Sequence, residues 1–517
     1  MLAAVCLLLA CGRKAAVPGV TANGESLQGE WGGDRGDVAV FRGVPFAQAP
    51  VGDLRWRAPR KHVPRAGLQK AAAFAAPCVQ GSYSVDWYVK VAAAFGHGPE
   101  VVGRPKPESE DCLYLNVWTP KLDPAARLPV MVFVHGGANK GGWSYEPNYV
   151  GDRLAARGAV VVTIAYRLGP FGFFAHPALD NGPGEAAANF GLLDMREAFV
   201  WVRANARQFG GDPDRITGFG ESAGAGNLLD LALAFPDEEP VVRRLIMEST
   251  GGGLDGRHSL DEERAFGSGL VAAAGLEGEV DTGRLRGIPA AELLKAAATV
   301  KGHYPEAVVD GLSLREQPSA ALRGPRASRL EILAGTNRDE WLMYVDPAVT
   351  SEDVDRFIAK KAPESADAVR SLVARESPLK AMDRLETASL MLCPTLLLAD
   401  AVNAKGGKGF VYYFTRQRSG AGGDALGAYH GTELPYVFDQ HDAWMPTLAP
   451  DRALTAAVMD YWVAFASSGA PQVKGLPEWP AYTAARPHVM ELGEKVAEVE
   501  PPDAGLCRYL GPERDTH

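Results

Sequence analysis

The stretch Gly218–Gly226 reads GFGESAGAG and carries the clearest local signal in the chain. It follows a short apolar strand, Arg215–Phe219 (RITGF), and runs into an apolar, helix-like segment, Asn227–Phe235 (NLLDLALAF). The pentapeptide Gly220–Gly224 therefore fits the pattern G-x-S-x-G in a strand–turn–helix context. A serine at the tip of such a turn has a strained backbone and an exposed hydroxyl, and small residues two positions away let strand and helix cross closely. The pattern predicts that Ser222 is a nucleophile.

A nucleotide-binding turn is the alternative interpretation of the same glycines. Gly218, Gly220 and Ala223 resemble a degraded dinucleotide fingerprint, in which backbone amides bind a pyrophosphate. That fingerprint belongs in the first strand–helix unit of a nucleotide-binding fold, whereas these residues lie near the middle of the chain. We therefore favour the nucleophile.

Short apolar strands alternate with longer amphipathic helices, such as Gly191–Phe209, from about residue 130 onward. This alternation predicts an α/β fold with a large, mostly parallel central sheet flanked by helices. Segments 20–60 and 100–125 are predicted as an antiparallel edge of that sheet, and segments 255–325 and 350–405 as helical insertions that form a cap. Residues 21–517 thus form one predicted domain. The predicted strands are Val130–Val134, Val160–Ala165, Ile216–Phe219, Leu245–Met247, Leu330–Leu333 and Phe410–Phe414.

A second glycine-rich turn, His135-Gly136-Gly137-Ala138, directly follows the predicted strand Val130–Val134. Turns of this kind direct backbone N–H groups into a cavity without obstruction by a Cβ atom. Together with the N–H of Ala223, they would bind the negative oxygen of a tetrahedral intermediate. A plain loop at a strand end is the alternative for this turn alone. His135 lies in the wrong chain order for a catalytic base and is predicted to be structural.

A nucleophilic serine needs a base, and in folds with this elbow the chain order is serine, acid, histidine. His430 follows the strand Phe410–Phe414 and lies where a base at the carboxyl edge of the sheet is expected. The acid is predicted in the loop after the preceding strand, where Asp339 and Glu340 are both available. The carboxylate that is not the acid should pair with Arg338 or face solvent.

Composition limits the classes of partner. The 517 residues are 46% hydrophobic and 22% charged, and 53 basic against 63 acidic residues give a formal charge of −10. The chain has no basic field to gather phosphates, so we expect no nucleic-acid partner. Six cysteines are too few for a disulfide scaffold but enough for one or two bridges in an oxidising compartment.

The N-terminal segment 1–20 is predicted to be a signal or lipoprotein-like leader and tether. Its apolar run, Leu2–Ala10, is too short to cross a bilayer but fits the core of an export signal. Leu8–Cys11 resembles the lipobox of bacterial lipoproteins, which makes Cys11 a candidate for lipidation and membrane anchoring. A miscalled start is the alternative, because the positive charges follow the run instead of preceding it. We expect an exported protein that is periplasmic, membrane-anchored or secreted.

These motifs together resemble the type-B carboxylesterase/cholinesterase family of α/β-hydrolases from about residue 20 to the end of the chain. Besides the elbow, the match includes the segments Phe41–Ala47 (FRGVPFA), Glu110–Val117 (EDCLYLNV), Asn189–Asp194 (NFGLLD), Phe209–Pro213 (FGGDP), Gly335–Glu340 (GTNRDE) and His430–Leu434 (HGTEL). So many ordered matches are specific to the family. The resemblance implies an α/β-hydrolase fold.

The resemblance also implies residue roles. Ser222 becomes the nucleophile, His430 the base and Glu340, in preference to Asp339, the acid. The oxyanion-hole positions fall on Gly137, Ala138 and Ala223. Two supporting positions and a disulfide are implied as well: Glu221 at the elbow, Ser249 beside the histidine loop, and the pair Cys78–Cys112. No pairing follows for Cys393 and Cys507, and free thiols are one interpretation of them.

Three departures from the family pattern concern the pocket. Asn139-Lys140 replaces the usual aromatic residue after the oxyanion turn, which would open or polarise the mouth. Trp341 replaces a common glycine after the acid. The insertion 255–325 matches weakly, and its histidines, His258 and His303, are predicted to be solvated surface residues.

The predicted activity is hydrolysis of a small-molecule carboxylic ester through an acyl-enzyme, with no metal or organic cofactor. An amidase, a carbamate hydrolase or a detoxifying esterase for a bulky natural ester would use the same chemistry. A non-catalytic, cholinesterase-like binding protein is the alternative from another class, although such proteins usually lose a triad member. Neither the acyl and alcohol groups nor the oligomeric state follow from these motifs.

Overall fold

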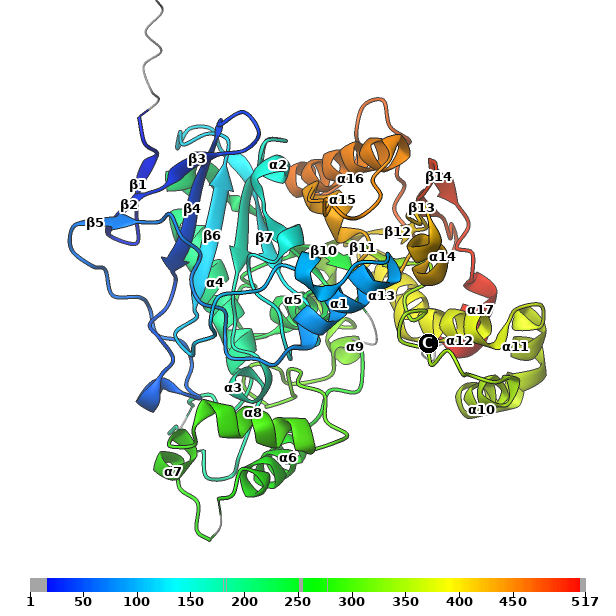
Figure 1. Ribbon diagram of the computed structural model, residues 1–517, viewed down its shortest axis with the longest axis horizontal. Coiled ribbons are helices and arrows are strands. Elements are labelled where there is room, and N and C mark those ends of the chain that lie inside the picture. The colour runs from blue at the N-terminus through cyan, green and yellow to red at the C-terminus, as the bar shows by residue number, and fades with distance from the viewer. Residues whose placement is uncertain (1–15, 180, 183, 251–253, 277, 512–517) are drawn as a thin grey trace, which may run out of the picture.

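The computed structural model describes residues 16–179, 181–182, 184–250, 254–276 and 278–511. Within them, eleven strands form one sheet and three form a second, smaller sheet (Figure 1). The strands are β1 (Gly19–Ala22), β2 (Glu25–Gln28), β3 (Glu30–Gly32), β4 (Val38–Pro45), β5 (Leu68–Lys70), β6 (Tyr114–Thr119), β7 (Leu128–Val134), β8 (Val160–Ile164), β9 (Gly211–Glu221), β10 (Arg244–Glu248), β11 (Glu331–Asn337), β12 (Lys408–Phe414), β13 (Val489–Leu492) and β14 (Val496–Val499).

The large sheet has the order β14-β13-β12-β11-β10-β9-β7-β8-β6-β4-β3. The seven strands β7 to β13 run parallel to one another. At the edges the pairing is antiparallel: β14 pairs with β13 in this way, and so do β6 with β8, β4 with β6 and β3 with β4. Central strands such as β8 (VVVTI) are buried along their whole length, as expected when helices cover both faces. The parallel arrangement brings the carboxyl ends of β7, β9, β11 and β12 to one edge.

Helices cover both faces of the sheet (Figure 1). Val132 of β7 lies in an apolar cluster with α4, α5 and α13, and the adjacent Phe133 lies in a second cluster with α2, α15 and α16. The helices are α1 (Tyr83–Ala94), α2 (Asp152–Ala155), α3 (Gly169–Gly172), α4 (Phe190–Asn205), α5 (Ala223–Leu233), α6 (Leu260–Ala273), α7 (Thr282–Arg286), α8 (Ala290–Thr299), α9 (Pro318–Ala321), α10 (Ser351–Lys361), α11 (Ala366–Val373), α12 (Pro378–Thr387), α13 (Cys393–Ala404), α14 (Ala421–Leu426), α15 (Leu434–Phe438), α16 (Ala449–Ser468) and α17 (Ala504–Leu510).

The predicted fold class is confirmed, and the six predicted core strands correspond to β7 to β12. The predicted antiparallel edge is correct for β3, β4 and β6. It is wrong for β1 and β2, which pair with each other and with β5 in the separate sheet. Their partner β5 lies about 40 residues further along the chain, so local pattern does not indicate the pairing.

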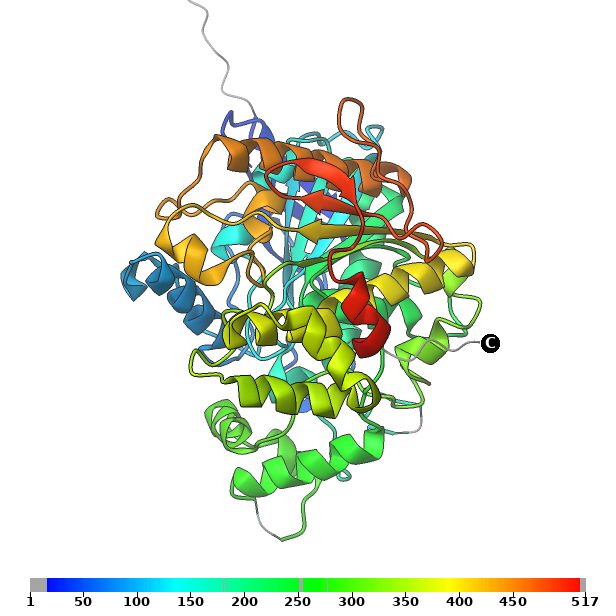
Figure 2. The same ribbon diagram turned by 90° about the vertical axis from the view of Figure 1, so that its right-hand side faces the viewer.

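The two segments predicted as insertions contain helices at one side of the sheet (Figure 2). Helices α6 to α9 lie between β10 and β11, and the apolar faces of α6, α7 and α8 pack on Phe171, Phe174 and Phe190. Helices α10 to α12 form their own apolar cluster with α17. Helix α13, by contrast, packs on β11 and β12 and belongs to the layers of the main fold.

Two disulfides are present among the described residues. Cys78 is joined to Cys112, as the resemblance implies. Cys393 is joined to Cys507, so the pairing that the sequence left open is a disulfide and the free-thiol interpretation is wrong. Helices α13 and α17 carry these cysteines 114 residues apart, and packing in one apolar cluster brings them together. Because structural disulfides persist in oxidising compartments, the two bridges indicate an extracellular or periplasmic protein.

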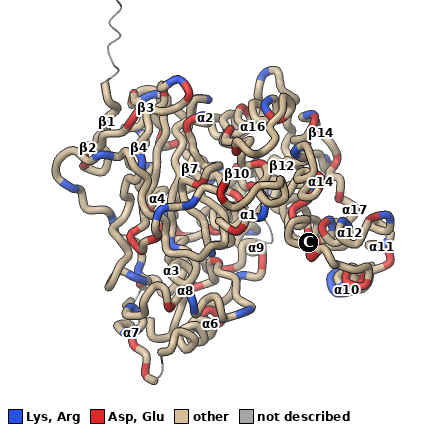
Figure 3. Tube along the Cα trace, in the orientation of Figure 1, with Lys and Arg blue, Asp and Glu red and all other residues tan. Residues whose placement is uncertain are grey.

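Charge and hydropathy are distributed as in a globular domain. Lys and Arg are interspersed with Asp and Glu along the described trace (Figure 3). One described helical run, Pro378–Ala404, is long and apolar enough to cross a membrane, and 67% of its most apolar window is buried inside the protein. Packing therefore accounts for its apolar side chains. Residues 1–15 of the predicted leader and tether, with Cys11, lie outside the described residues, and the end of the predicted segment already belongs to β1.

Candidate active site

Ser222 occupies the tight turn between β9 and α5. Its backbone angles, φ 55° and ψ −125°, are strained for a residue with a side chain. A Cβ atom on Gly220 would lie 2.6 Å from the carbonyl oxygen of Val134, and one on Gly224 only 2.1 Å from the same atom. The two glycines of the pentapeptide are thus required because the elbow presses against the end of β7.

The hydroxyl of Ser222 faces His430, which lies in the loop after β12. Its Oγ is 2.9 Å from His430 Nε2, and His430 Nδ1 is 2.6 Å from Glu340 Oε2. The three side chains come from positions 222, 340 and 430 and meet at the carboxyl edge of the sheet. When serine, imidazole and carboxylate are arranged in this order, the imidazole can accept the serine proton at Nε2 while the carboxylate accepts a hydrogen bond from Nδ1–H.

Glu340 and Asp339 have separate surroundings. The second oxygen of Glu340 accepts hydrogen bonds from the backbone N–H of Asn337 at 2.6 Å and from Thr336 Oγ1 at 2.8 Å. Asp339 points away, pairs with Arg338, and accepts a 2.8 Å hydrogen bond from the backbone N–H of Ala428. Asp339 therefore fixes the loop that leads to His430. Sequence reasoning missed this positioning role.

Buried carboxylates surround the imidazole. Glu221 Oε1 lies 3.1 Å from His430 Nε2, and Glu433 accepts a hydrogen bond from Asn337 Nδ2 at 2.5 Å. Burial by itself lowers the pKa of His430, but the carboxylates of Glu221 and Glu340 outweigh burial and raise it well above its usual value. Burial raises the pKa of Glu221 and that of Glu433. The site thus favours a positive charge on His430.

The turn after β7 passes directly beside the elbow. A Cβ atom on Gly136 would lie 2.6 Å from Glu221 Oε2, and Gly137 and Ala138 both have positive φ, 92° and 57°. Gly137 and Ala138 line the space in front of Ser222 on one side, and Ala223 lines it on another. His135 itself is buried and stacks on Tyr166 at 4.6 Å, and burial lowers the pKa of His135 to about 4.

Asn139, the departure after this turn, is buried and lines a cavity in front of Ser222. Its Nδ2 donates a 2.9 Å hydrogen bond to the carbonyl oxygen of Pro305, and its Oδ1 accepts one from Asn227 Nδ2 at 2.8 Å. Asn139 therefore ties the turn to α5 and to the insertion. Lys140 is exposed, with Nζ 5.6 Å from the centre of the Tyr304 ring.

Two cavities meet at Ser222. The narrow cavity has a volume of about 50 Å³ and is walled by α1 and the elbow, including Trp87, Tyr88 and Glu221. Tyr88 donates a 2.9 Å hydrogen bond to Glu146, a buried carboxylate whose pKa burial raises to about 7. This side of the site is small and aromatic, and Tyr88 and Glu146 are paired with each other there.

The wide cavity has a volume of about 490 Å³ and opens towards the insertion. Arg257 and Tyr304 of the insertion line it, as does Asp230 of α5. The side chain of Arg257 is buried and pairs with Asp230 at 3.1 Å and with Glu306 at 2.7 Å. Burial raises the pKa of Asp230 to about 6 in spite of this guanidinium. No motif in the sequence pointed to these residues.

The remaining predicted residues take different places. Ser249 is buried with φ 51°, and its Oγ has no hydrogen-bond partner among the described residues. Trp341 lines the wide cavity. The prediction of a solvated surface is wrong for His303, whose side chain is only 8% exposed, because its ring stacks on Phe266 of α6 and bonds to Glu263. The side chain of His258 is 37% exposed.

A strand–serine–helix turn at the carboxyl edge of a mostly parallel sheet defines the serine hydrolases of the α/β-hydrolase fold. The sequence model of the Carboxylesterase family matches residues 17–504. The chain therefore belongs to the carboxylesterase family and is a carboxylic ester hydrolase.

Similar proteins are bacterial hydrolases. The chain is 34% identical over 483 residues to a fumonisin B1 esterase of Sphingopyxis macrogoltabida, covering 90% of this chain and 86% of the relative. It is 32% identical over 499 residues to a phenmedipham hydrolase of Pseudarthrobacter oxydans, covering 91% and 95%. A Geobacillus stearothermophilus carboxylesterase of known structure superposes with a TM-score of 0.81 at 32% identity, covering 95% of this chain and 99% of the other.

Proposed function

We propose that the ester is cleaved through an acyl-enzyme on Ser222. The serine oxygen attacks the carbonyl carbon while His430 Nε2 takes the hydroxyl proton, and Glu340 stabilises the resulting imidazolium. The imidazolium then gives this proton to the leaving alcohol. Water, activated by the same imidazole, hydrolyses the acyl-enzyme. The observation that carries the proposal is the continuous line from Ser222 Oγ through His430 to Glu340, at 2.9 and 2.6 Å.

The backbone N–H groups of Gly137, Ala138 and Ala223 would stabilise the oxyanion. Positive φ at the first two residues and the start of α5 at the third support this assignment, because both features direct amides towards the hydroxyl side of the elbow. Each such donor contributes about 3–4 kcal/mol to the transition state in enzymes where it has been removed. Glu221 would add to the stabilisation of the imidazolium, and Ser249 would support the histidine loop.

The two cavities support an asymmetric ester, with a small group on one side of the carbonyl and a bulky, polar group on the other. About 50 Å³ beside Trp87 admits only a small group, whereas about 490 Å³ beside Arg257 and Tyr304 admits a large one. This difference favours the second candidate, a detoxifying esterase, amidase or carbamate hydrolase for a bulky compound. Relatives named for fumonisin B1 and phenmedipham are consistent with it.

The mechanism is tested by Ser222→Ala with a short-chain aryl ester. We expect kcat to fall about 1,000-fold or more with an unchanged melting temperature, as for other triad variants. A fluorophosphonate should label the parent protein and the exposed control Ser328→Ala, but not Ser222→Ala. Retained turnover or labelling in Ser222→Ala would refute the assignment.

We also propose that the protein is exported through its N-terminal segment and lipidated at Cys11. The two disulfides support export, and the lipobox-like Leu8–Cys11 supports lipidation. Mass spectrometry of the mature protein should find residue 11 as a diacylglyceryl cysteine at the N-terminus. An intact Met1 would contradict both export and lipidation.

A further inference from the structure

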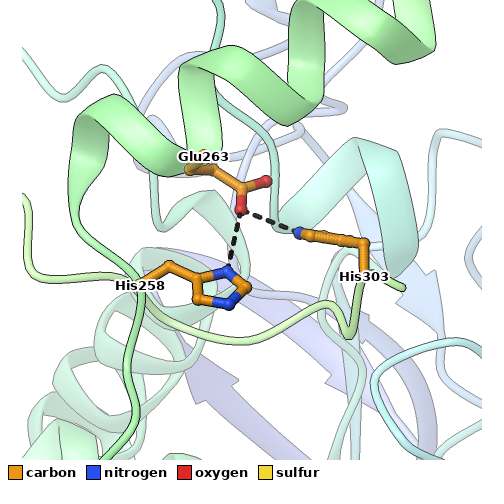
Figure 4. A group of neighbouring side chains, drawn as sticks. All are labelled: His258, Glu263 and His303. Carbon is orange, nitrogen blue, oxygen red and sulfur yellow. Dashed lines mark hydrogen bonds and ion pairs between the residues drawn. The ribbon is translucent and has the colours of Figure 1, made fainter. Parts of the chain in front are cut away.

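Two histidines and a glutamate converge in the insertion, outside the line of Ser222 and His430 (Figure 4). His303 Nε2 lies 2.8 Å from Glu263 Oε2, and His258 Nδ1 lies 4.0 Å from the same oxygen. All three potential ligand atoms lie within 4.8 Å of one another. Both rings therefore point towards one carboxylate oxygen.

Glu263 is a buried carboxylate with no Lys or Arg ion-paired to it in the described part of the chain. Its side chain is 2% exposed, and its only ion-pair neighbours among the described residues are the two imidazoles. Its other oxygen, Oε1, is buried and lacks a hydrogen-bond partner in the described part of the chain. Buried carboxylates are costly unless a cation or a metal ion compensates them.

The three ligands are held in place by their own elements. Glu263 lies in the first turn of α6, which a capping box from Ser259 to Glu262 fixes. The backbone carbonyl of His258 accepts a hydrogen bond from the N–H of Val309 at 2.8 Å. The ring of His303 stacks on Phe266 of the same helix at 3.5 Å. Such support orients ligands before an ion arrives.

We propose that His258, Glu263 and His303 bind one divalent transition-metal ion of the Zn²⁺ type, with water as the fourth ligand. Two imidazoles and a carboxylate are a common donor set for zinc. Bonds of about 2.0–2.1 Å in a tetrahedral site place ligand atoms about 3.3 Å apart. The observed 2.8 and 4.0 Å separations lie on either side of this value, and the half-exposed His258 is the ligand with room to move inwards.

The ion would stabilise one wall of the wide cavity. Arg257 precedes His258, and Tyr304 follows His303, so each histidine adjoins a residue that lines this cavity. A shared ion would join the two segments and fix the wall opposite the elbow. The proposal does not depend on the catalytic assignment, because metal binding is measured directly.

The test uses the full mature protein without a histidine tag, freed of metal by a chelator and titrated with ZnCl₂ in a calorimeter. We expect one Zn²⁺ per chain with a Kd of about 10 μM or tighter, and a rise in melting temperature with zinc. Co²⁺ in place of Zn²⁺ should give the visible absorption of a nitrogen-ligated, four-coordinate ion.

The informative variant is His258→Ala, because this side chain is the most exposed of the three and the fold depends on it least. We expect its zinc affinity to fall at least about 10-fold, with an unchanged melting temperature in chelator. Glu263→Gln should lose affinity as well. The matched control His488→Ala removes a histidine 3.3 Å from Glu498, elsewhere on the surface, and should bind zinc like the parent protein. The absence of saturable binding, or equal affinity in His258→Ala and the parent, would overturn the proposal.

Discussion

The two sides of Ser222 are built in different ways. On the elbow side, glycines in short motifs at the strand ends let backbone pack directly on backbone. The narrow cavity there has a volume of about 50 Å³. On the insertion side, residues from distant segments line a cavity of about 490 Å³. Side-chain ion pairs such as Arg257–Asp230 hold its wall together. With the proposed mechanism, this difference predicts that the elbow side fixes the chemistry and the insertion side selects the substrate. Substitutions on the two sides should therefore change different kinetic constants.

The largest effect is expected on the chemistry side from Glu340→Gln. The amide retains the size of the carboxylate but can present an N–H to His430 Nδ1, which favours the wrong tautomer of the imidazole. We expect kcat to fall about 1,000-fold or more for small and bulky esters alike. Steady-state kinetics with both substrates checks this result. A loss confined to one ester would contradict the division between the two sides.

Packing at the elbow is tested by Gly224→Ala. The new Cβ would lie 2.1 Å from the carbonyl oxygen of Val134 and 2.6 Å from that of His135, and neither backbone can yield easily. We expect a loss of about 3 kcal/mol in the free energy of unfolding, measured by denaturant titration.

Gly226→Ala is the matched control in the same helix, since nothing lies within 4 Å of its added Cβ. It should be neutral or stabilise the protein by up to about 1 kcal/mol. Equal destabilisation by the two substitutions would show that the close approach of β7 is not the cause.

On the insertion side, Tyr304→Ala removes an aromatic wall of the wide cavity. We expect kcat/KM to fall about 10-fold for a bulky ester, because apolar contact with the large group is lost, and to stay nearly constant for an aryl acetate. Leu312→Ala, at another exposed position of the same insertion, is the control. An equal loss with both esters would mean that Tyr304 acts on the chemistry instead.

The smallest effect concerns pH. The negative charge of Glu221, 3.1 Å from His430 Nε2, favours the imidazolium and raises the pKa of His430. Glu221→Gln removes this charge, so the pKa of His430 should fall and the base should be neutral at lower pH. The acidic limb of the kcat/KM profile should then move to lower pH by about one unit. The surface variant Glu239→Gln should leave the limb in place, and a shift to higher pH in Glu221→Gln would contradict the assignment.

The sequence is most informative where one local pattern fixes both backbone and chemistry. The elbow around Ser222 and the turn at Gly137 are such patterns, because glycine positions reveal where backbones cross. The choice between Asp339 and Glu340 could not be made from periodicity, since both lie in one loop and differ only in the direction of the side chain. Family resemblance, not spacing, favoured Glu340.

Several contacts between distant segments have no motif that indicates them. Cys393 and Cys507 meet only because α13 and α17 pack together. His303 is buried because α6, about 40 residues earlier, supplies both Phe266 and Glu263. The wall around Arg257 likewise depends on how the insertion folds back on α5. These pairings follow from tertiary packing, which leaves no periodic trace in the sequence.

The bridge from Cys393 to Cys507 encloses the segment that carries His430, whereas Ser222 lies outside both bridged loops. The proposed base thus lies inside a loop that a covalent bond closes, and the proposed nucleophile does not. Reduction of this bridge would open the loop around the proposed base, whereas the backbone contacts of the elbow with β7 would remain.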